Sequence, residues 1–355
     1  LMERLHYPAV NSRINPAQIP GGMLTNLQNQ LRQMGREDLL DKLYDEIPVV
    51  RRDSGYAPLV TPTSQIIGAQ ATYNLITGQR YSFVSDEFRM LLRGEFYTAY
   101  TPYQPEMSQG TLQAIFEYQS MMVQLTGMEV SNASHYDGAT SLAEAAIMAF
   151  SRFREKRTRI VLCSGIHPEY RDVVHTYMQG MNVEIVGDTA CWVDMDELIK
   201  LIDDNTAMVA VAYPNFFGEI DPIEKAINAA HEHGAMACVV TDPISLGLLK
   251  PPGWMGADIV VGVGQGLGIP MSFGGPYLGF FTTREEYVRR MAGRLVGETV
   301  DAEGEKGYVL TLTAREQHIR REKATSNICT NQGLMALSAA VYMSVMGKHG
   351  LRQVA

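Results

Sequence analysis

The sequence contains few cysteines, and their spacing fits neither a metal site nor a disulfide framework. Its 355 residues hold four, and no two of them form the CxxC pair typical of zinc and redox sites. They are far apart along the chain: Cys163, Cys191, Cys238 and Cys329. We therefore expect reduced thiols, as in a cytosolic protein. We predict no metal site either, because His231 and His233 are two residues apart and would point apart on a helix.

Positive charge is also scarce. The chain has 30 Lys and Arg against 39 Asp and Glu, a net charge of -9, and no basic cluster of the kind that binds nucleic acid. Residues 259–281 carry no charge, but they include seven glycines and two prolines, which a lipid-facing helix would tolerate poorly. Residues 1–10 lack the apolar core of a signal peptide. We predict a soluble, cytoplasmic protein with neither nucleic acid nor membrane as a partner.

The usual nucleotide-binding glycine motifs are missing. Residues 262–268 (GVGQGLG) do not fit GxGxxG, because the third glycine would fall on Leu267. No GxxxxGK[ST] phosphate loop occurs anywhere in the sequence. The sequence therefore predicts neither a dinucleotide fingerprint nor a P-loop.

What the chain does contain is a change of pattern near residue 95. Before it, Leu24, Leu27, Leu31 and Met34 recur at the three- and four-residue spacings of an amphipathic helix. After residue 110, strand-like and helix-like segments alternate, which predicts an α/β fold with a mostly parallel sheet. The expected helices include residues 110–125, 141–154, 195–202 and 222–233. The expected strands are residues 159–163, 183–186, 207–212, 237–241, 259–263 and 277–282.

Ligands of such sheets bind at the carboxyl ends of the strands, and two places there could carry chemistry. Residues 137–141 (DGATS) open a helix, whose first N–H groups favour an anion such as a phosphate. Asp242 follows a strand directly, where a carboxylate could pair with a protonated ring nitrogen. Each also has a purely structural interpretation, a helix cap for the first and a turn cap for Asp242.

Several long sequence motifs resemble those of subunit 1 of glycine dehydrogenase (decarboxylating), the P-protein of the glycine cleavage system. They occur in the family's order between about residues 94 and 355. The words are TAYTPYQPE (98–106), SQG (108–110), YDGAT (136–140), HPEYR (167–171), GADI (256–259), FGGP (273–276) and SNICTN (326–331).

This resemblance implies a pyridoxal-phosphate-dependent, aminotransferase-like fold (fold type I). In that family a lysine holds the cofactor as an internal aldimine, and in the two-subunit form the lysine belongs to the other subunit. Gln265 occupies the matching place here and cannot form a Schiff base. Asp242 matches the ring-nitrogen aspartate in position only. We therefore expect no catalytic residue in this chain, with pyridoxal phosphate held by the partner subunit and none bound covalently here. The predicted contribution is a wall over the partner's site, from Tyr100, Tyr103 and Gln104.

Residues 18–95 resemble a different family. QIPGGMLTNL (18–27) and PLVTPTSQI (58–66) are similar to the late part of biotin-dependent carboxyltransferases, such as oxaloacetate decarboxylase alpha chain and pyruvate carboxylase. The changeover falls at residues 93–96, so we expect an apparent chimera. The expected domains are a helical fragment (1–95), an aminotransferase-like large domain (96–283) and the start of a truncated small C-terminal domain (284–355). We also expect Leu24, Leu27 and Leu31 to be poorly covered, because the barrel of that family is absent.

Three functions follow as hypotheses. The first is a non-lysine subunit that helps a lysine-bearing subunit 2 decarboxylate glycine and transfer the aminomethyl group to the lipoyl H-protein. It would be an enzyme only as part of that complex. The second is a non-catalytic pairing scaffold. The third is a carboxyltransferase or decarboxylase fragment, which rests on the N-terminal words alone.

Overall fold

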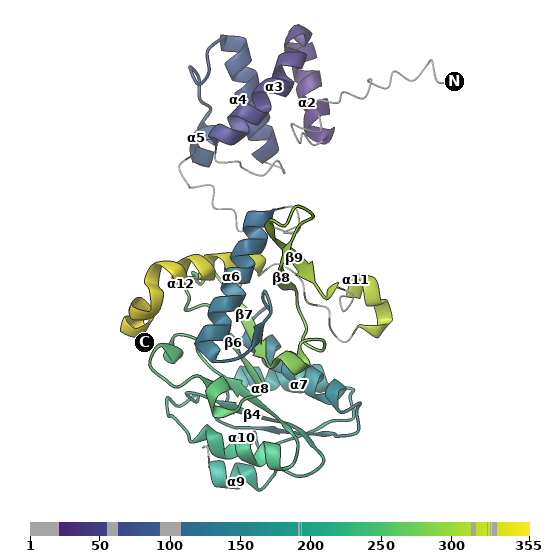
Figure 1. The fold of residues 1–355 in the computed structure, drawn as a ribbon, viewed down its shortest axis with the longest axis vertical. Coiled ribbons are helices and arrows are strands. Elements are labelled where there is room, and N and C mark those ends of the chain that lie inside the picture. Colours follow the sequence, from purple (N-terminus) through teal and green to yellow (C-terminus); the bar gives the residue numbers. More distant parts are fainter. Residues whose placement is uncertain are drawn as a thin grey trace, which may run out of the picture. The chain divides into compact units, whose positions relative to one another are not determined.

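The computed structural model describes residues 21–54, 63–92, 108–190, 192, 194–313, 317–324, 326, 328 and 332–355. The chain divides into two compact units, Leu1–Thr98 and Ala99–Ala355, each with its own hydrophobic core (Figure 1). Residues 284–355 belong to the second unit in this division. The expected separation of a small domain at residue 283 stays a prediction.

The described part of the first unit is helical. Its helices are α2 (Gly21–Gln33), α3 (Leu40–Asp53), α4 (Thr63–Thr77) and α5 (Asp86–Leu92). Leu27 and Leu31 are four residues apart, so they share one face of α2. They are only 4% and 1% exposed, and they join a core that includes Ile47 and Ile67. The expectation of poorly covered leucines was therefore wrong for these two, because the neighbouring helices supply the missing cover. The side chain of Leu24 lies outside the described residues.

A buried carboxylate ties the first unit together. Glu46 of α3 is buried, and Arg80 forms a bidentate ion pair with its carboxylate. Arg80 Nε lies 2.9 Å from Glu46 Oε1, and Nη2 lies 2.7 Å from Oε2. Asn74 of α4 donates a further hydrogen bond of 2.9 Å to Oε1. Because a buried charge is costly unless it is paired and hydrogen-bonded, these contacts keep the carboxylate tolerable inside the unit.

The second unit is built on a seven-stranded sheet with the order β1-β7-β6-β5-β4-β2-β3. The neighbours from β6 to β3 run parallel, whereas β7 is antiparallel to both β6 and β1. The strands are β1 (Val130–Ser131), β2 (Arg159–Leu162), β3 (Glu184–Val186), β4 (Thr206–Ala212), β5 (Met236–Val240), β6 (Ile259–Val263) and β7 (Gly279–Thr283). Strands β4, β5 and β7 are buried throughout, as both-face coverage by helices requires. The predicted mostly parallel sheet is confirmed.

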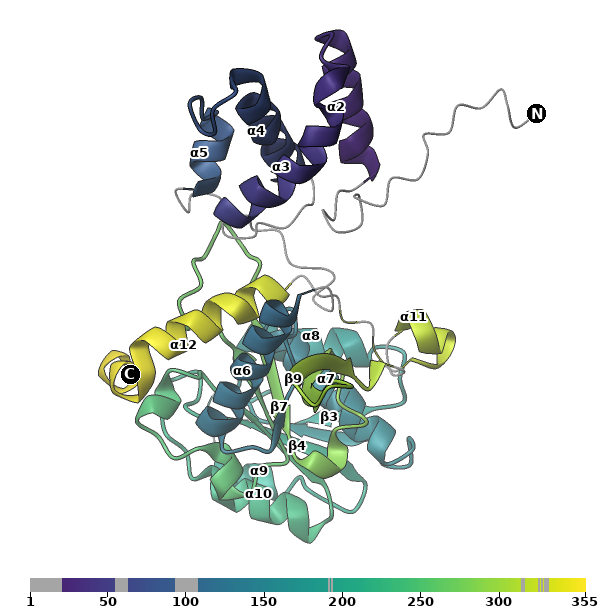
Figure 2. The same cartoon turned by 45° about the horizontal axis from the view of Figure 1, so that its top comes forward.

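Helices cover both faces of this sheet. Figures 1 and 2 show α7 (Gly138–Arg152) and α8 (Pro168–Met178) on one side, and α9 (Met195–Ile199) and α10 (Ile223–Glu232) on the other. Helix α6 (Gln109–Thr126) packs against α12 (Gly333–Val354). A hairpin of β8 (Leu295–Val300) and β9 (Lys306–Thr311) forms a second sheet, and α11 (Gln317–Arg320) follows it. The sequence did not predict this hairpin. None of the described helices is both long and apolar enough to cross a membrane.

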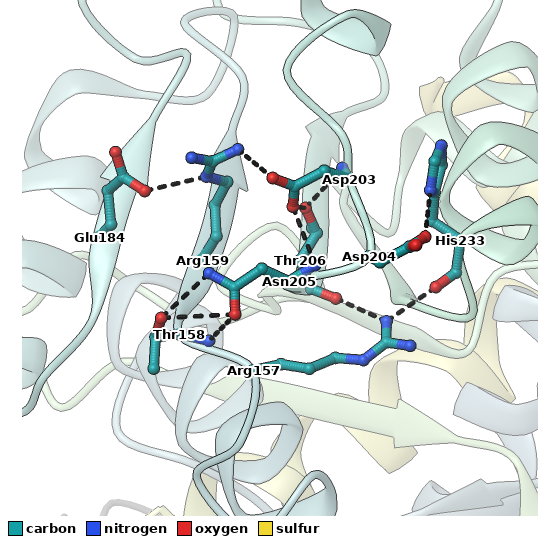
Figure 3. A network of polar contacts seen from close by, with 9 residues as sticks. All are labelled: Arg157, Thr158, Arg159, Glu184, Asp203, Asp204, Asn205, Thr206 and His233. Atoms are coloured by element: carbon teal, nitrogen blue, oxygen red, sulfur yellow. Dashed lines mark hydrogen bonds and ion pairs between the residues drawn. The ribbon is translucent and has the colours of Figure 1, made fainter.

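At the amino ends of the parallel strands, polar side chains join the loops (Figure 3). The Arg157 guanidinium donates to the carbonyl oxygens of Thr206, at 2.9 Å, and His233, at 2.8 Å. It also stacks over the Phe153 ring, 4.5 Å from the centroid. Arg159 instead pairs with the carboxylates of Glu184 and Asp203, at 2.9 and 2.5 Å. This edge lies at the opposite ends of the strands from any cofactor place, so its contacts are structural.

These two arginines should differ in their effect on stability. Arg157→Ala leaves two carbonyl acceptors without their donor and should lower the free energy of unfolding by about 2 kcal/mol. Arg159→Ala, the matched control, breaks ion pairs with half-exposed carboxylates and should cost at most about 1 kcal/mol. Urea titration of the full chain measures both. Equal losses would contradict the distinction between carbonyl and carboxylate partners.

Candidate active-site remnant

Three segments that the sequence marked separately come together at the carboxyl edge of the sheet. Asp242 directly follows Thr241 after β5, Gln265 lies in the turn after β6, and Gly138 is the first residue of α7. A β-carbon on Gly266 would lie 3.9 Å from Asp242 Oδ1, and one on Gly138 would lie 2.9 Å from the carbonyl carbon of Gly262. The start of α7 and the loops after β5 and β6 are therefore neighbours at the carboxyl ends of the strands, where ligands of parallel sheets bind.

The first turn of α7 is already capped by its own residues. The Asp137 carboxylate accepts hydrogen bonds from Thr140 N–H, at 2.7 Å, and from the Thr140 hydroxyl, at 2.9 Å. Ser141 donates its N–H and its hydroxyl to the Asp137 carbonyl oxygen, at 3.0 and 2.7 Å. These donors serve a capping box, and a carboxylate stands where an anion would bind. The structural interpretation of residues 137–141 accounts for these contacts.

Asp242 is likewise engaged with its own loop. Its Oδ1 accepts the Ile244 N–H at 2.9 Å, and its carbonyl oxygen accepts the Ser245 hydroxyl at 2.7 Å. This is the side-chain turn that aspartate commonly forms. Asp242 is an exposed residue at the edge of the candidate site.

The sequence did not predict Tyr170 as a site residue, although Tyr170 lies within the family-like motif HPEYR (167–171). Tyr170 lies in the first turn of α8, next to Gly138. A β-carbon added to Gly138 would lie 2.5 Å from the Tyr170 hydroxyl oxygen. His167, the N-cap of α8, has its ring 5.5 Å from that of Tyr170 and 4.8 Å from that of Phe216. Burial, together with the charges of Asp137 and Asp242, raises the pKa of Tyr170 to about 12. The phenol is therefore neutral near neutral pH.

Lysine is absent from this place. All eight lysines of the sequence fall within the described residues, and none lies in the turn Gly264–Gly268 that contains Gln265. Four of them form ion pairs elsewhere: Lys200 with Glu197, Lys225 with Asp196, Lys250 with Glu224 and Lys306 with Glu298. A place with two carboxylates, capped donors and no amine does not fit covalently bound pyridoxal phosphate.

The remaining residues singled out in the sequence are an aromatic and amide group before α6 and two histidines at the end of α10. Tyr100, Tyr103 and Gln104 lie outside the described residues, so their role stays a prediction. His231 pairs with Asp258 at 2.9 Å and His233 with Asp204 at 2.8 Å, on separate partners. Within the described ranges, no three His, Cys, Asp or Glu side chains gather as metal ligands.

One buried acid lies in the same helix as the capping box. Glu144 is four residues beyond Thr140 on α7, is 5% exposed, and accepts a 2.7 Å hydrogen bond from the Ser326 hydroxyl. Burial raises the pKa of Glu144 to about 7, although the Ser326 hydrogen bond opposes this effect. Near neutral pH, Glu144 is therefore poised between its neutral and charged forms.

Comparison with known proteins gives a consistent result. The family model described as "Glycine cleavage system P-protein" matches residues 70–355. The probable glycine dehydrogenase (decarboxylating) subunit 1 of Desulforamulus reducens is 58% identical over 269 residues, which cover 75% of this chain and 60% of that protein. The corresponding protein of Exiguobacterium sibiricum is 47% identical over 346 residues, which cover 92% and 76%. The chain thus spans about three-fifths of the length of the first of these relatives.

Solved structures agree on the fold. The crystal structure of an inhibitor-bound glycine decarboxylase (P-protein) of the glycine cleavage system is 41% identical, with a TM-score of 0.66 over 92% of this chain and 76% of that one. A sphingosine-1-phosphate lyase of Burkholderia pseudomallei is 16% identical, with a TM-score of 0.50. The alignment covers 83% of this chain and 70% of the lyase chain, and it shows a shared fold alone. The predicted fold type I architecture of pyridoxal-phosphate enzymes is confirmed.

The matches also bear on the N-terminal region. The match to the Exiguobacterium protein covers 92% of the chain, which is more than the length of the second unit, Ala99–Ala355. The match therefore includes part of the first unit. These comparisons favour glycine cleavage over a carboxyltransferase fragment, and the fusion at residues 93–96 stays a prediction. The family match over residues 70–355 and the identity shared with subunit 1 proteins establish that this chain belongs to the glycine cleavage system P-protein family.

Proposed function

We propose that this chain is the non-lysine subunit of a glycine cleavage P-protein. It would act with a lysine-bearing subunit that holds pyridoxal phosphate, to decarboxylate glycine and pass the aminomethyl group to the lipoyl H-protein. The observation that carries this proposal is that the turn Gly264–Gly268 contains Gln265 and no lysine, at the position that the family resemblance assigns to the cofactor lysine. A chain without that amine needs a second subunit to supply it.

The contribution of this chain would be to complete the partner's site rather than to carry the reaction. The word TAYTPYQPE, residues 98–106, is rich in aromatic and amide side chains. Such a segment can close a cofactor pocket across an interface and exclude water during decarboxylation. We assign this role to Tyr100, Tyr103 and Gln104, which precede the Ser108 cap of α6.

The test is reconstitution with the lysine-bearing subunit. The two chains should co-purify, and glycine–bicarbonate exchange in the presence of lipoyl H-protein should require both of them. Tyr103→Phe removes one hydroxyl and little volume, so exchange should fall by roughly threefold to tenfold, the value of one hydrogen bond, while assembly persists. Tyr100→Ala also deletes packing area and should reduce both exchange and assembly.

Two outcomes would contradict the proposal. Exchange by the isolated chain would show that no partner lysine is needed. A complex that forms but exchanges at the rate of the partner alone would make this chain a pairing scaffold. If the complex is active and Tyr103→Phe leaves exchange unchanged, then the assignment of Tyr103 fails while the subunit function stands.

A further inference from the structure

The Tyr170 side chain lies against the start of α7. A β-carbon on Gly138 would lie 2.5 Å from its hydroxyl oxygen and 2.9 Å from its Cε2 atom, both closer than carbon atoms pack. Glycine at position 138 therefore leaves room for the ring and hydroxyl of Tyr170. The phenol therefore lies beside the first residue of α7, whose first turn is capped by Asp137.

The Tyr170 hydroxyl also interacts electrostatically with residues on both sides of the candidate site. The carboxylates of Asp137 and Asp242 both act on the Tyr170 hydroxyl, and Asp242 Oδ1 borders the turn that contains Gln265 and Gly266. A ligand at the first turn of α7 would meet the Tyr170 side chain, because that side chain lies against Gly138. A phosphorylated ligand would meet two carboxylates as well, which disfavours its charge.

We propose that Tyr170 fills the cofactor place of this subunit and excludes pyridoxal phosphate from it, by the volume of its ring. The lost lysine is then one of two barriers, because restoring the amine alone would leave the place occupied. This device would direct the coenzyme to whichever subunit lacks the tyrosine.

The test uses the full chain without a partner, and pyridoxal phosphate as the probe. Four proteins are incubated with it, reduced with borohydride and analysed by mass spectrometry for a lysine adduct: wild type, Gln265→Lys, Gln265→Lys with Tyr170→Ala, and Gln265→Lys with Tyr170→Phe. Gln179→Lys, at an exposed position after α8, sets the level of non-specific modification. Wild type and Gln265→Lys should stay at that level. The Tyr170→Ala double variant should exceed it by at least about tenfold, which corresponds to about 1.4 kcal/mol.

Each variant separates one explanation from another. Tyr170→Phe keeps the ring, so its double variant should remain near the background. High labelling of Gln265→Lys alone would overturn the proposal, since the tyrosine would then be no barrier. So would background labelling of the Tyr170→Ala double variant in a chain whose melting temperature is unchanged. If Tyr170→Ala unfolds the second unit, Tyr170→Leu replaces it, because leucine keeps apolar volume without the flat ring. High labelling with Tyr170→Phe would assign exclusion to the hydroxyl and refute the assignment to the ring.

Discussion

Glu144→Gln should stabilise the second unit by about 3 kcal/mol above pH 7 and should have little effect below pH 4.5. Burial raises the folded-state pKa of Glu144 from 4.5 to about 7, so the folded chain binds the proton more tightly than the unfolded chain. Stability from this group is therefore fully present below pH 4.5 and is lost as the pH rises through about 7. Glutamine removes the charge while its carbonyl oxygen still accepts the Ser326 hydroxyl.

Urea titrations of wild type and variant across this pH range measure the effect. Glu117→Gln on α6 is the matched control, because Glu117 also accepts a side-chain hydrogen bond but is exposed, and it should give no comparable pH-dependent gain. Burial lowers the pKa of His135 to about 4, but that histidine is present in every protein compared, so its effect cancels. A variant that is less stable than wild type above pH 7 would show that Glu144 is held charged by a partner.

Ile47→Ala should destabilise the first unit by about 3 kcal/mol and leave the second unit folded. Ile47 is 1% exposed at the centre of the first unit's core, beside Leu31, Leu43 and Ile67. Truncation to alanine removes its contacts and leaves a cavity that the neighbouring helices fill only in part. Because each unit has its own core, the loss should stay within residues 1–98.

Hydrogen exchange followed by mass spectrometry resolves the two units in the intact chain. Peptides from α3 and α4 should lose protection in Ile47→Ala, whereas peptides from β4 and β5 should keep theirs. Ile76→Ala on α4 is the matched control, since Ile76 is 38% exposed in the same unit and should change protection little. Joint loss of protection in both units would mean that they unfold as one cooperative structure.

Elements with strong local signals could be predicted from the sequence. The expected strand 259–263 and β6 (Ile259–Val263) have the same bounds, and the expected helix 110–125 differs from α6 (Gln109–Thr126) by one residue at each end. Continuous apolar runs, helical periodicity and caps such as Ser108 and Gly127 act within a few residues. They need no knowledge of distant partners, which is why they were sufficient.

Elements that depend on pairing were less predictable. The expected helix 141–154 begins at Gly138 instead, because the capping box of Asp137 and Thr140 extends it before the apolar pattern starts. The antiparallel direction of β7 and the pairing of the two-residue β1 follow from hydrogen bonds to neighbouring strands. A loop as long as residues 264–278 allows the next strand to run in either direction, so the direction of β7 is determined by its pairing with β6 and β1.

The sequence by itself determined that residue 265 is glutamine and that no lysine lies in residues 264–268, because residue identity depends on no structure. The tertiary structure alone decided what surrounds that position. Tyr170 reaches Gly138 only because α8 packs beside α7, and Ser326 meets Glu144 across 182 residues of chain. Contacts of this kind depend on how helices pack on the sheet, and no local pattern of residues carries that information.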